Sequence, residues 1–421
     1  MQINSKEKII EHFKNGIKKD QFIGVENEKF LFIKSKNQRI DYDNVRIILE
    51  KFQKKYNWDP VNEGKYLIGL KHEGKSISLE PGNQIELAGE KLKNIHSVCS
   101  ESYTFQDQLK EICDELDIEI LSVGYDPVTK LNQVPNNPKE RYKIMTTEMP
   151  KNGELSLDMM YNTSGTQINL DYTSENDFIK KFKLVSNLTP LTVALFANSA
   201  VKENKPNGYL SYRTKVWQKT SRGGLPNIFL ENMDFEKYSD FIIDMPLLFL
   251  FHNKTHISPN KKKFKDFMEG KIKDIEYRLP ETKDLEIHLS TIFTELRLKN
   301  YLEIRSLDAC EWDCHCAGPA FFTGLIYGKL EEALDVIKNW KSNDILNAYL
   351  EAPKKGLNTE IENKTILEWS EIFLNISREG LITRNKKNKK GNDETIYLRN
   401  VENVIKNKKT KAEITLEKIN F

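Results

Sequence analysis

The stretch Phe22-Ile-Gly-Val-Glu-Asn-Glu-Lys-Phe-Leu-Phe-Ile33 decides the fold, because it has the composition of a long β-strand. Aromatic and β-branched residues dominate it, and such residues favour strands. Side chains alternate between the two faces of a strand, so we expect Glu26 and Glu28 on one face beside Gly24, and Val25 on the other. Two carboxylates so close together indicate either a solvated face or a cation held between them.

Three further segments show the same alternation of polar and aliphatic residues. Their polar members are Glu80 and Glu86, Gln167 and Asn169, and Glu303 and Arg305. A half-solvated antiparallel sheet also alternates in this way, and it is the alternative interpretation. Solvated faces usually mix Lys, Thr and Ser with Glu, whereas these faces carry mostly Glu and carboxamides. A sheet face lined with carboxylates suits a hard cation such as Mg²⁺, and an adjacent arginine suits the phosphates that such a cation carries.

Six longer motifs, some of which contain these polar residues, follow one another along the chain. They are Gly24-Val-Glu-Asn-Glu-Lys-Phe30, Ser78-Leu-Glu-Pro-Gly-Asn-Gln-Ile-Glu-Leu-Ala-Gly89, Gln167-Ile-Asn-Leu-Asp171, Ala194-Leu-Phe-Ala-Asn-Ser199, Gly208-Tyr-Leu-Ser-Tyr-Arg213 with Trp217, and Arg297-Leu-Lys-Asn-Tyr-Leu-Glu-Ile-Arg305. From about Phe22 to Gly328 the chain resembles glutamate–cysteine ligase of the plant and proteobacterial type. The resemblance implies an α+β fold, with a curved antiparallel sheet that forms a glutamine synthetase-like funnel and helices on its outer face.

The resemblance also implies a reaction. The γ-carboxyl of L-glutamate would be joined to the amine of L-cysteine, with ATP and Mg²⁺, through a γ-glutamyl phosphate, as the first step of glutathione synthesis. A carboxylate does not acylate an amine in water, so ATP must activate it first, and cations between the two anions offset their repulsion. Three alternatives stay open: a related γ-glutamyl ligase that uses another amine, an inactive homologue that serves as a regulatory subunit, and a nucleic-acid-binding protein.

The resemblance assigns roles to particular residues of the funnel. The metal ligands would be Glu26, Glu28, Glu80, Glu86 and Glu303, with Gln167 as a weaker candidate because related ligases place a histidine there. Arg305 would be catalytic and would meet the transferring phosphate of ATP. Arg213 would also be catalytic, in the glutamate pocket.

The substrate pockets follow from the same resemblance. Glutamate's α-carboxylate needs a guanidinium partner, and Arg141 and Arg213 match the family's pocket arginines. Trp217 would line this pocket, and Thr163 and Thr166 would contribute hydrogen bonds. Cysteine has a small, weakly polar side chain, so its pocket should be aromatic, and Phe251 stands near a family aromatic.

Some segments depart from the family's pattern. The loop after Trp217 is shorter and lacks the family's aspartates, yet it retains Arg222, which would contact phosphate of the nucleotide. After Arg305 many relatives read Gly-Ala-Asp-Gly-Gly, whereas this chain reads Ser306-Leu-Asp-Ala-Cys310.

Cysteines gather at one place in the chain, Cys310-x3-Cys314-His315-Cys316. The cluster lacks the spaced second pair of a zinc module, so free thiols, buried or partly buried, are the favoured interpretation and zinc is the alternative. Plant members of the family use a disulfide switch, and the sequence leaves open whether Cys99 or Cys113 pairs with this cluster.

Bulk composition limits the class of protein. The 421 residues include 38% hydrophobic residues, and 64 Lys and Arg nearly balance 62 Asp and Glu. This balance does not favour nucleic-acid or membrane partners, so the expected partners are the two small-molecule substrates, bound by a monomer or homodimer. The polar amino terminus, the lack of a long apolar run and the odd number of cysteines predict a cytoplasmic protein.

The coarse pattern of elements suggests two parts. Residues 1–340 are predicted to form the catalytic domain, and residues 341–421 a helical, lysine-rich extension packed on or following it. A helix over 175–198, capped by Ser174, is expected to be interrupted at Pro190, because proline cannot donate a helical hydrogen bond. Another, strongly apolar helix is expected over residues 321–340.

Overall fold

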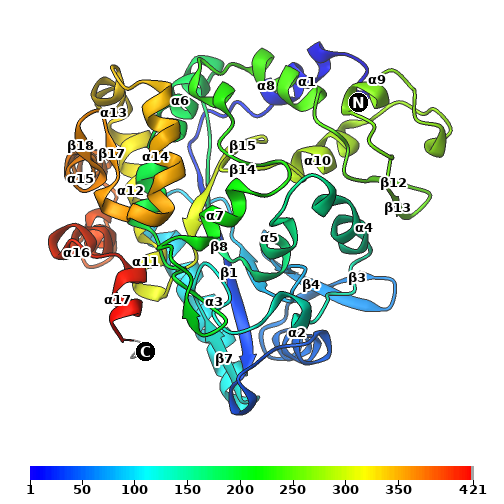
Figure 1. Ribbon diagram of the computed structural model, residues 1–421, viewed down its shortest axis with the longest axis horizontal. Helices are drawn as coiled ribbons and strands as arrows, with labels where there is room; N and C mark the ends of the chain where they lie inside the picture. Colours follow the sequence, from blue (N-terminus) through cyan, green and yellow to red (C-terminus); the bar gives the residue numbers. More distant parts are fainter. Residues whose placement is uncertain (419–421) are drawn as a thin grey trace.

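The strand β1, Ile23–Ile33, lies inside a ten-stranded sheet (Figure 1). The computed structural model describes residues 1–418. The main path of the sheet runs in the order β15 (Leu296–Leu298), β16 (Leu302–Asp308), β8 (Gly165–Leu170), β1, β6 (Ile85–Ala88), β5 (Lys75–Leu79), β4 (Tyr66–His72) and β3 (Asp59–Glu63). The distal half of β1 also pairs with β2 (Gln38–Arg39) and β7 (Ile118–Leu121). Every pairing in this sheet is antiparallel, so the predicted α+β fold with a large antiparallel sheet is confirmed.

Helices form a large part of the remaining chain. They are α1 (Lys6–Lys14), α2 (Tyr42–Tyr56), α3 (Ile95–Glu115), α4 (Glu140–Glu148), α5 (Ser156–Asn162), α6 (Glu175–Leu195), α7 (Tyr212–Gln218), α8 (Phe235–Ile243), α9 (Phe264–Met268), α10 (Thr282–Ser290), α11 (Trp312–His315), α12 (Ala317–Thr323), α13 (Leu330–Ile337), α14 (Ser342–Lys355), α15 (Ile366–Arg384), α16 (Arg399–Asn407) and α17 (Lys411–Lys418). Four short pairs complete the strands: β9 (Val201–Lys202) with β10 (Lys205–Pro206), β11 (Gly223–Gly224) with β14 (Phe293–Thr294), β12 (Leu250–His252) with β13 (Thr255–Ile257), and β17 (Glu360–Ile361) with β18 (Lys364–Thr365).

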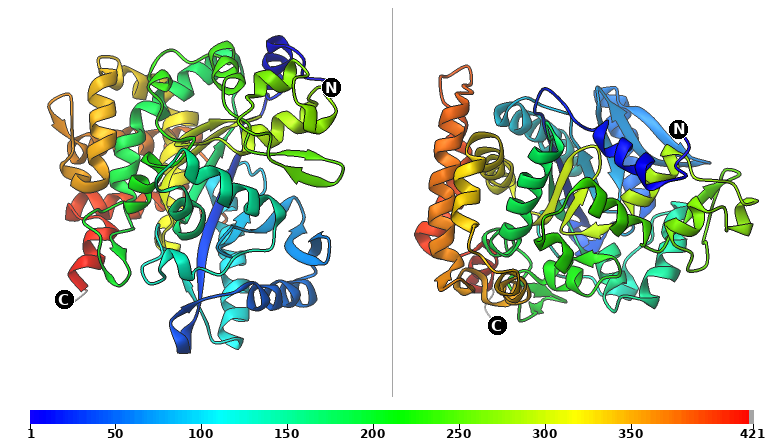
Figure 2. Two further views of the ribbon diagram at one scale, coloured as in Figure 1. Left: turned by 45° about the vertical axis from the view of Figure 1, so that its right-hand side comes forward. Right: turned by 90° about the horizontal axis from the view of Figure 1, so that it is seen from above.

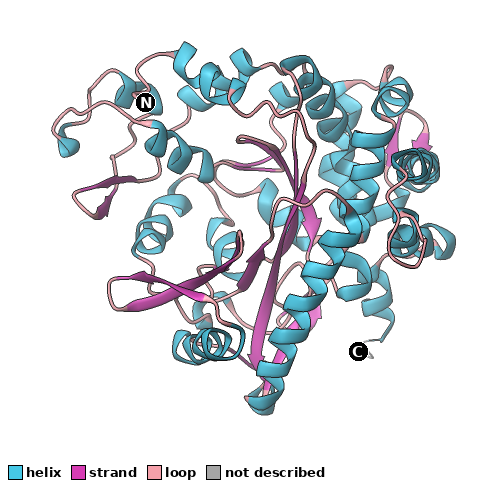
Figure 3. Cartoon of the chain, turned by 180° about the vertical axis from the view of Figure 1, so that it is seen from behind, coloured by secondary structure: helices cyan, strands magenta, loops and turns pink. Residues whose placement is uncertain are grey.

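The aliphatic face of the sheet carries the main core. Val25, Ile168 and Ile304 are aligned across β1, β8 and β16, and all three are buried. They belong to one apolar cluster with buried side chains of α6, α12, α14 and α15. Viewed from behind, helices lie along one side of the long strands and partly in front of them (Figure 3). A second cluster joins α2 and α3 to the strands β4, β5 and β6. The opposite face of the sheet is therefore left for polar side chains.

The helix predicted over 175–198 forms as α6, and Ser174 caps it by accepting a hydrogen bond from the Asp177 amide. The predicted interruption at Pro190 is wrong, because α6 continues through this residue to Leu195. Proline removes only one backbone hydrogen bond, and Leu188 and Leu191 on either side are fully buried. Burial of the surrounding turns therefore outweighs the local preference of proline.

The single helix expected over residues 321–340 is divided. Its first part is α12, a π-helical turn follows over Gly324–Gly328, and α13 begins at Leu330. The turn packs tightly on α15: a Cβ atom at Gly324 would lie 2.2 Å from the Ser377 carbonyl oxygen. The regular α-helix that hydropathy predicts is therefore interrupted by a π-helical turn at the place where it packs closely on α15.

The helices after residue 341 gather on one side of the molecule, orange to red in Figures 1 and 2. The main apolar cluster includes residues from both sides of the predicted boundary at residue 340, among them Ala333, Ala348 and Phe373. The division into residues 1–340 and 341–421 stays a prediction. Within residues 1–418, no helix has both the length and the apolar character needed to cross a membrane.

The buried pair Arg39–Asp126 gives a test of the fold. Their Nη1 and Oδ2 atoms lie 2.6 Å apart, neither side chain is exposed, and Arg39 also lies 4.3 Å from the Phe30 ring centroid. Asp126→Ala would leave a buried cation without its partner and should lower the free energy of unfolding by about 3–5 kcal/mol, measured by urea denaturation. The control Glu351→Ala breaks only an exposed pair with Lys355 and should leave the midpoint nearly unchanged. Equal midpoints for Asp126→Ala and wild type would contradict this interpretation.

Candidate active site

The acidic residues share one face of the sheet. In the antiparallel register Glu28 lies opposite Glu86 on β6, Glu26 lies opposite Gln167 on β8, and Glu303 lies opposite Asn169. Because opposed residues in neighbouring strands point to the same side, the predicted alternation is confirmed across four strands. Glu80 stands in the turn after β5, where its amide donates to the Gln84 carbonyl at 2.9 Å.

Neutral donors hold the first acidic pair in place. Asn169 Nδ2 donates to Glu26 Oε1 at 2.8 Å, and Gln167 Nε2 donates to Glu28 Oε1 at 3.1 Å. The Gly165 amide donates to the other oxygen of Glu28 at 2.7 Å. All three donors are neutral amides, so these hydrogen bonds do not neutralise the negative charge of either carboxylate.

The carboxylates influence one another strongly. Burial, followed by the negative charge of Glu80, raises the pKa of Glu28 from 4.5 to about 7. Burial, followed by the charges of Glu80, Glu26 and Glu28, raises the pKa of Glu86 well above its usual range. Mutual repulsion of this kind is what a bound cation would relieve. As the side chains lie, no three His, Cys, Asp or Glu groups within residues 1–418 are close enough together to hold a metal ion.

Glu303 lies in a different electrostatic environment. Arg297 contacts both of its oxygens, Lys299 Nζ lies 3.2 Å from Oε1, and Arg305 Nη1 lies 3.4 Å from Oε2. Burial by itself would raise the pKa of Glu303, but these three cations lower it well below its usual range. Glu303 is therefore a fully paired carboxylate, whereas Glu28 and Glu86 are not.

Two arginines meet at Trp217. The guanidinium carbons of Arg213 and Arg305 lie 4.8 Å and 5.2 Å from the Trp217 ring centroid. Arg213 Nη2 donates to the Arg305 carbonyl at 2.9 Å, and Arg305 Nη1 donates to Gln167 Oε1. A Cβ atom on Gly165 would lie 2.6 Å from Arg213 Nη2, so glycine at this point of β8 gives the guanidinium its place.

Several donors near this face are buried without a partner. They are Arg213 Nε and Nη1, Arg305 Nε, Trp217 Nε1 and Arg141 Nε. Buried donors are nearly always paired in proteins, so a group of unpaired ones indicates a place for an anionic or carbonyl ligand. Arg141, on α4, lies close enough to Glu80 and Glu86 for their charges to act on it. Arginines and carboxylates thus occupy one shared site.

The predicted threonines do not both face this site. Thr166 lies opposite Asn27, on the aliphatic side of the sheet, and its hydroxyl donates to Asn27 Oδ1 at 3.2 Å. The expectation that the Thr166 side chain lines the glutamate pocket is therefore not supported. Thr163, just before β8, donates to the Met159 carbonyl at 2.6 Å, and a substrate contact from it stays a prediction.

Phe251 and Arg222 lie at the edge of this region. Phe251, on the β12–β13 hairpin, contacts His256, with ring centroids 5.1 Å apart. Arg222 donates to the Thr291 carbonyl at 2.7 Å and to the Pro246 carbonyl, and burial lowers its pKa to about 9. These bonds give Arg222 a role in holding loops together, and its contact with phosphate stays a prediction.

Two aromatic residues near the site have no signal in the sequence. Phe249 belongs to the same buried cluster as Trp217, and Phe293 contacts Trp217 with ring centroids 6.4 Å apart. Both lie in segments of unremarkable composition, Phe249 within Leu247–His252 and Phe293 at the start of β14. Only the packing of distant segments reveals them.

The cysteines form two disulfides, Cys99–Cys316 and Cys310–Cys314, and Cys113 is a buried free thiol. The expectation of free thiols in the Cys310–Cys316 cluster is therefore wrong for all three of its cysteines. Zinc is not supported there either, since the described residues contain no suitable group of ligands. The sequence could not reveal the longer pairing, which joins residues 217 positions apart.

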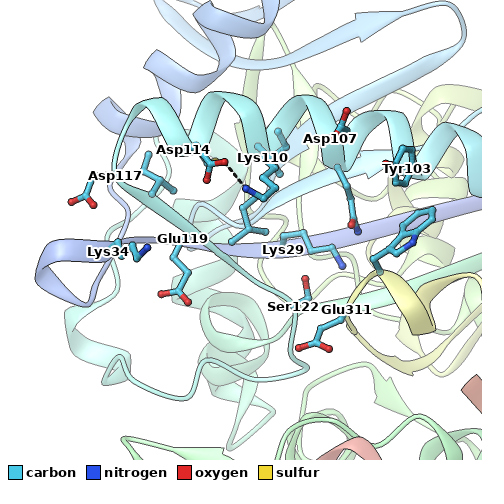
Figure 4. A pocket seen from close by; sticks show the side chains of 16 residues that line it. Lys29, Lys34, Tyr103, Asp107, Lys110, Asp114, Asp117, Glu119, Ser122 and Glu311 are labelled. Atoms are coloured by element: carbon cyan, nitrogen blue, oxygen red, sulfur yellow. Dashed lines mark hydrogen bonds and ion pairs between the residues drawn. The ribbon is translucent and has the colours of Figure 1, made fainter. Parts of the chain in front are cut away.

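A groove of about 590 Å³ lies on the other side of β1 (Figure 4). It runs beside α3, β7 and α11, and Lys29, Lys110 and Glu311 are among its lining residues. Lys29 follows Glu28 in β1 and so points away from the acidic face; its amine donates to the Cys310 carbonyl at 2.9 Å. This groove is thus separate from the site formed by the carboxylates and arginines.

Comparison with known proteins gives a consistent result. The model of glutamate-cysteine ligase family 2 matches residues 22–418. Glutamate–cysteine ligase B of rice, named as chloroplastic, is 40% identical over 396 residues, which is 93% of this chain and 79% of the rice protein. The chloroplastic enzyme of tomato is 38% identical over 420 residues, 98% of this chain and 79% of its own length. The Arabidopsis thaliana enzyme is 37% identical over 423 residues, 99% of this chain and 80% of its own length.

A solved structure supports the fold. Glutamate–cysteine ligase of Francisella tularensis, in complex with AMP, aligns with a TM-score of 0.54 at 13% identity, covering 95% of this chain and 85% of that one. At this identity the likeness concerns the fold alone.

The cytoplasmic prediction is contradicted. The relatives from rice, tomato and Arabidopsis thaliana, which are 37–40% identical over nearly the whole chain, are all named as chloroplastic. The prediction rested partly on the cysteines as a sign of a reducing compartment, and four of the five are paired in disulfides. An odd cysteine count is therefore a poor guide to the compartment of this protein.

The raised pKa of Glu28 predicts a pH dependence of stability. Between pH 4.5 and about 7 the folded protein keeps a proton that the unfolded chain has released, so the free energy of unfolding falls as pH rises through this window. In wild type this fall in the free energy of unfolding should be on the order of 3 kcal/mol across the window. Glu28→Gln cannot ionise, so its free energy of unfolding should not show this fall. Urea unfolding at several pH values, in a buffer with a chelator, measures this. The control Glu119→Gln, at an exposed position on β7, should keep the wild-type dependence. An unchanged slope in Glu28→Gln would contradict the assignment.

Proposed function

The chain belongs to glutamate–cysteine ligase family 2, and we propose that it joins the γ-carboxyl of L-glutamate to the amine of L-cysteine at the expense of ATP. The products are γ-glutamylcysteine, ADP and phosphate, in the first step of glutathione synthesis. The observation that carries this proposal is the match of the family over nearly the whole chain, together with identities of 37–40% to ligases named for this reaction. The resemblance inferred from the sequence motifs is confirmed.

The geometry suits the activation of a carboxylate by ATP. Phosphoryl transfer to a carboxylate brings two anions into contact, and positioning and charge neutralisation account for most of its catalysis. Unpaired donors of Arg213 and Arg305 next to the carboxylates provide positive charge where these anions would meet. Arg305 would stabilise the transferring phosphoryl group, and Arg213 would hold glutamate for the formation of γ-glutamyl phosphate.

The chemistry of the donors suits Mg²⁺, which prefers carboxylate oxygens, and the carboxylates would draw closer together to hold it. We propose Glu26, Glu28, Glu80 and Glu86 as its ligands, because burial and then repulsion among these carboxylates raise the pKa values of Glu28 and Glu86, and a cation would relieve that repulsion. When bound, Mg²⁺ would polarise the phosphoryl group and offset the repulsion of the anions. Glu303, which three cations already surround, and Gln167, which bonds Arg305, would be ligands only after these contacts rearrange.

The glutamate pocket is proposed between α4, α7 and β8. Guanidinium groups bind a carboxylate through two parallel hydrogen bonds, and both Arg141 and Arg213 have buried donors without partners. Trp217 lies against Arg213 and would close one wall of the pocket. Thr163 would add a hydrogen bond at the start of β8.

The cysteine pocket is proposed at the aromatic end of the site. Phe293 contacts Trp217, Phe249 belongs to the same apolar cluster, and Phe251 follows two residues later in β12. Aromatic walls suit a small thiol side chain and exclude larger polar amines. Arg222 is kept as a proposed nucleotide contact.

The same unit would act as a monomer or a homodimer on small-molecule substrates. We propose that residues 1–340 are its catalytic domain and that residues 341–421 are a helical extension that supports it. A contact across this boundary favours such support: Tyr349 of α14 donates to Glu295 Oε1 at 2.6 Å, and Glu295 directly precedes β15.

A panel of amines tests the substrate. With ATP, Mg²⁺ and L-glutamate, release of ADP should depend on the added amine. Among the amines tested, L-cysteine should give the highest kcat/KM. Product analysis by mass spectrometry should show γ-glutamylcysteine. Preference for another amine would establish the related γ-glutamyl ligase instead, and no turnover with any amine would favour an inactive homologue.

Replacement of a proposed ligand tests the acidic site. Glu28→Gln keeps the size of the side chain but removes its charge, and should lower the rate of ADP formation by about 100-fold or more. The matched control Glu119→Gln changes an exposed glutamate on β7, which also pairs with β1, and should keep the wild-type rate. Equal rates for Glu28→Gln and wild type would refute the proposed metal site.

A further inference from the structure

Asp308 is a buried carboxylate at the end of β16, three residues after Arg305. Only 2% of its surface is exposed, and neither its charge nor its position was part of the site predicted from the sequence. It lies where the end of α6 and the start of α7 meet the sheet. A buried charge is costly unless it is well hydrogen bonded, so its partners indicate its role.

Three donors converge on Asp308, and all come from the segments that flank Arg213. The Asn198 amide donates to Oδ2 at 2.8 Å, and the Ser199 hydroxyl donates to the same oxygen at 2.6 Å. The Ser211 hydroxyl donates to Oδ1 at 3.0 Å. One carboxylate therefore joins residues 198–199, which follow α6, to the residue that directly precedes α7.

The contacts continue directly to Arg213. Ser199 Oγ, held by Asp308, accepts the hydrogen bond of the Arg213 amide at 3.1 Å. Ser211 is the N-cap of α7, and its hydroxyl oxygen accepts from the Thr214 amide at 3.3 Å. The guanidinium end of Arg213 donates to the Arg305 carbonyl, which belongs to the same strand as Asp308. β16 thus fixes both the backbone and the guanidinium of Arg213.

We propose that Asp308 is a positioning residue for glutamate binding, which acts by holding Arg213 in place through Ser199 and Ser211. This inference rests on the proposed function, because it takes Arg213 as the arginine that binds glutamate. Asp308 itself does not touch substrate. Its role would be to keep a long, flexible side chain in one orientation before glutamate arrives, which saves the entropy of ordering it.

A purely structural role makes a different prediction. If Asp308 only tied α6 and α7 to the sheet, its replacement would lower stability without a selective effect on glutamate. If it positions Arg213, glutamate binding weakens while ATP binding changes little, and the effect disappears once Arg213 itself is altered. A double-mutant cycle separates these two roles.

The experiment measures the Kd of L-glutamate by calorimetry on the full chain, for wild type, Asp308→Asn, Arg213→Lys and the double variant. Asp308→Asn preserves the shape but removes the charge and leaves one accepting oxygen where the carboxylate has two, so the three donors cannot all be satisfied and the Kd should rise by about tenfold or more. The double variant should bind no more than about threefold worse than Arg213→Lys alone. The KM for ATP should stay within about twofold of wild type in Asp308→Asn.

The matched control is Glu394→Gln, another fully buried carboxylate, which accepts from the Ile95 amide at 2.6 Å and pairs with Arg384. It should lower the Tm while leaving the glutamate Kd unchanged. If Asp308→Asn does not fold, Ser199→Ala removes only the hydroxyl that joins Asp308 to Arg213 and should still weaken glutamate binding severalfold.

Three results would overturn the inference: a folded Asp308→Asn or Ser199→Ala with wild-type glutamate affinity, additive losses in the double variant, or an equal loss of ATP affinity. Failure of the proposed function would be seen separately, since wild type would then form no γ-glutamylcysteine from glutamate and cysteine. A wild type that is active, beside an Asp308→Asn with unchanged Kd, would reject only the role of Asp308.

Discussion

Repulsion among carboxylates on one face of an antiparallel sheet is the constraint on which this structure depends. The two-residue period of a strand places Glu26 and Glu28 on the same side, and the register adds Glu86 directly opposite Glu28. Repulsion between these carboxylates would tend to separate the strands if apolar packing on the opposite face did not stabilise the sheet. Val25, Ile168 and Ile304 are aligned there and buried under helices, so apolar burial on one face maintains the charge density on the other.

The polar face is divided into two ends with different charges. At the β16 end, Arg297, Lys299 and Arg305 surround Glu303 and lower its pKa. Toward β6, the carboxylates Glu28 and Glu86 have hydrogen-bond donors but no such set of cations, and their pKa values are raised. One end therefore suits anions, and the other suits cations. A ligand such as a metal–nucleotide complex carries both kinds of charge, and this polarity would orient it along the face.

The sequence predicted those parts of the site that depend on local periodicity. Alternation along β1 is enough to place Glu26 and Glu28 together, and the family motifs add Arg213, Trp217 and Arg305. Features that arise from distant contacts could not be predicted. Gly324 packs on Ser377 and converts a helix into a π turn, Cys99 pairs with a cysteine 217 positions away, and Thr166 faces away from the site because its register partner is Asn27. Each of these three features depends on which segments pack together in the fold. The residue pattern of a single segment does not contain this information.

One of the carboxyl-terminal helices also contacts the segments around Arg213. Glu295 is buried, and the charges of Arg213 and Arg305 both act on its carboxylate. Tyr349 of α14 donates to Glu295, while its own carbonyl accepts from Gln218 at the end of α7. Arg305 in turn donates its amide to the Glu295 carbonyl at 2.9 Å. A helix that lies after residue 341 thus contacts α7, which carries Arg213, and Glu295, whose carbonyl accepts from the Arg305 amide, so this helix can hold both arginines from the side away from the sheet.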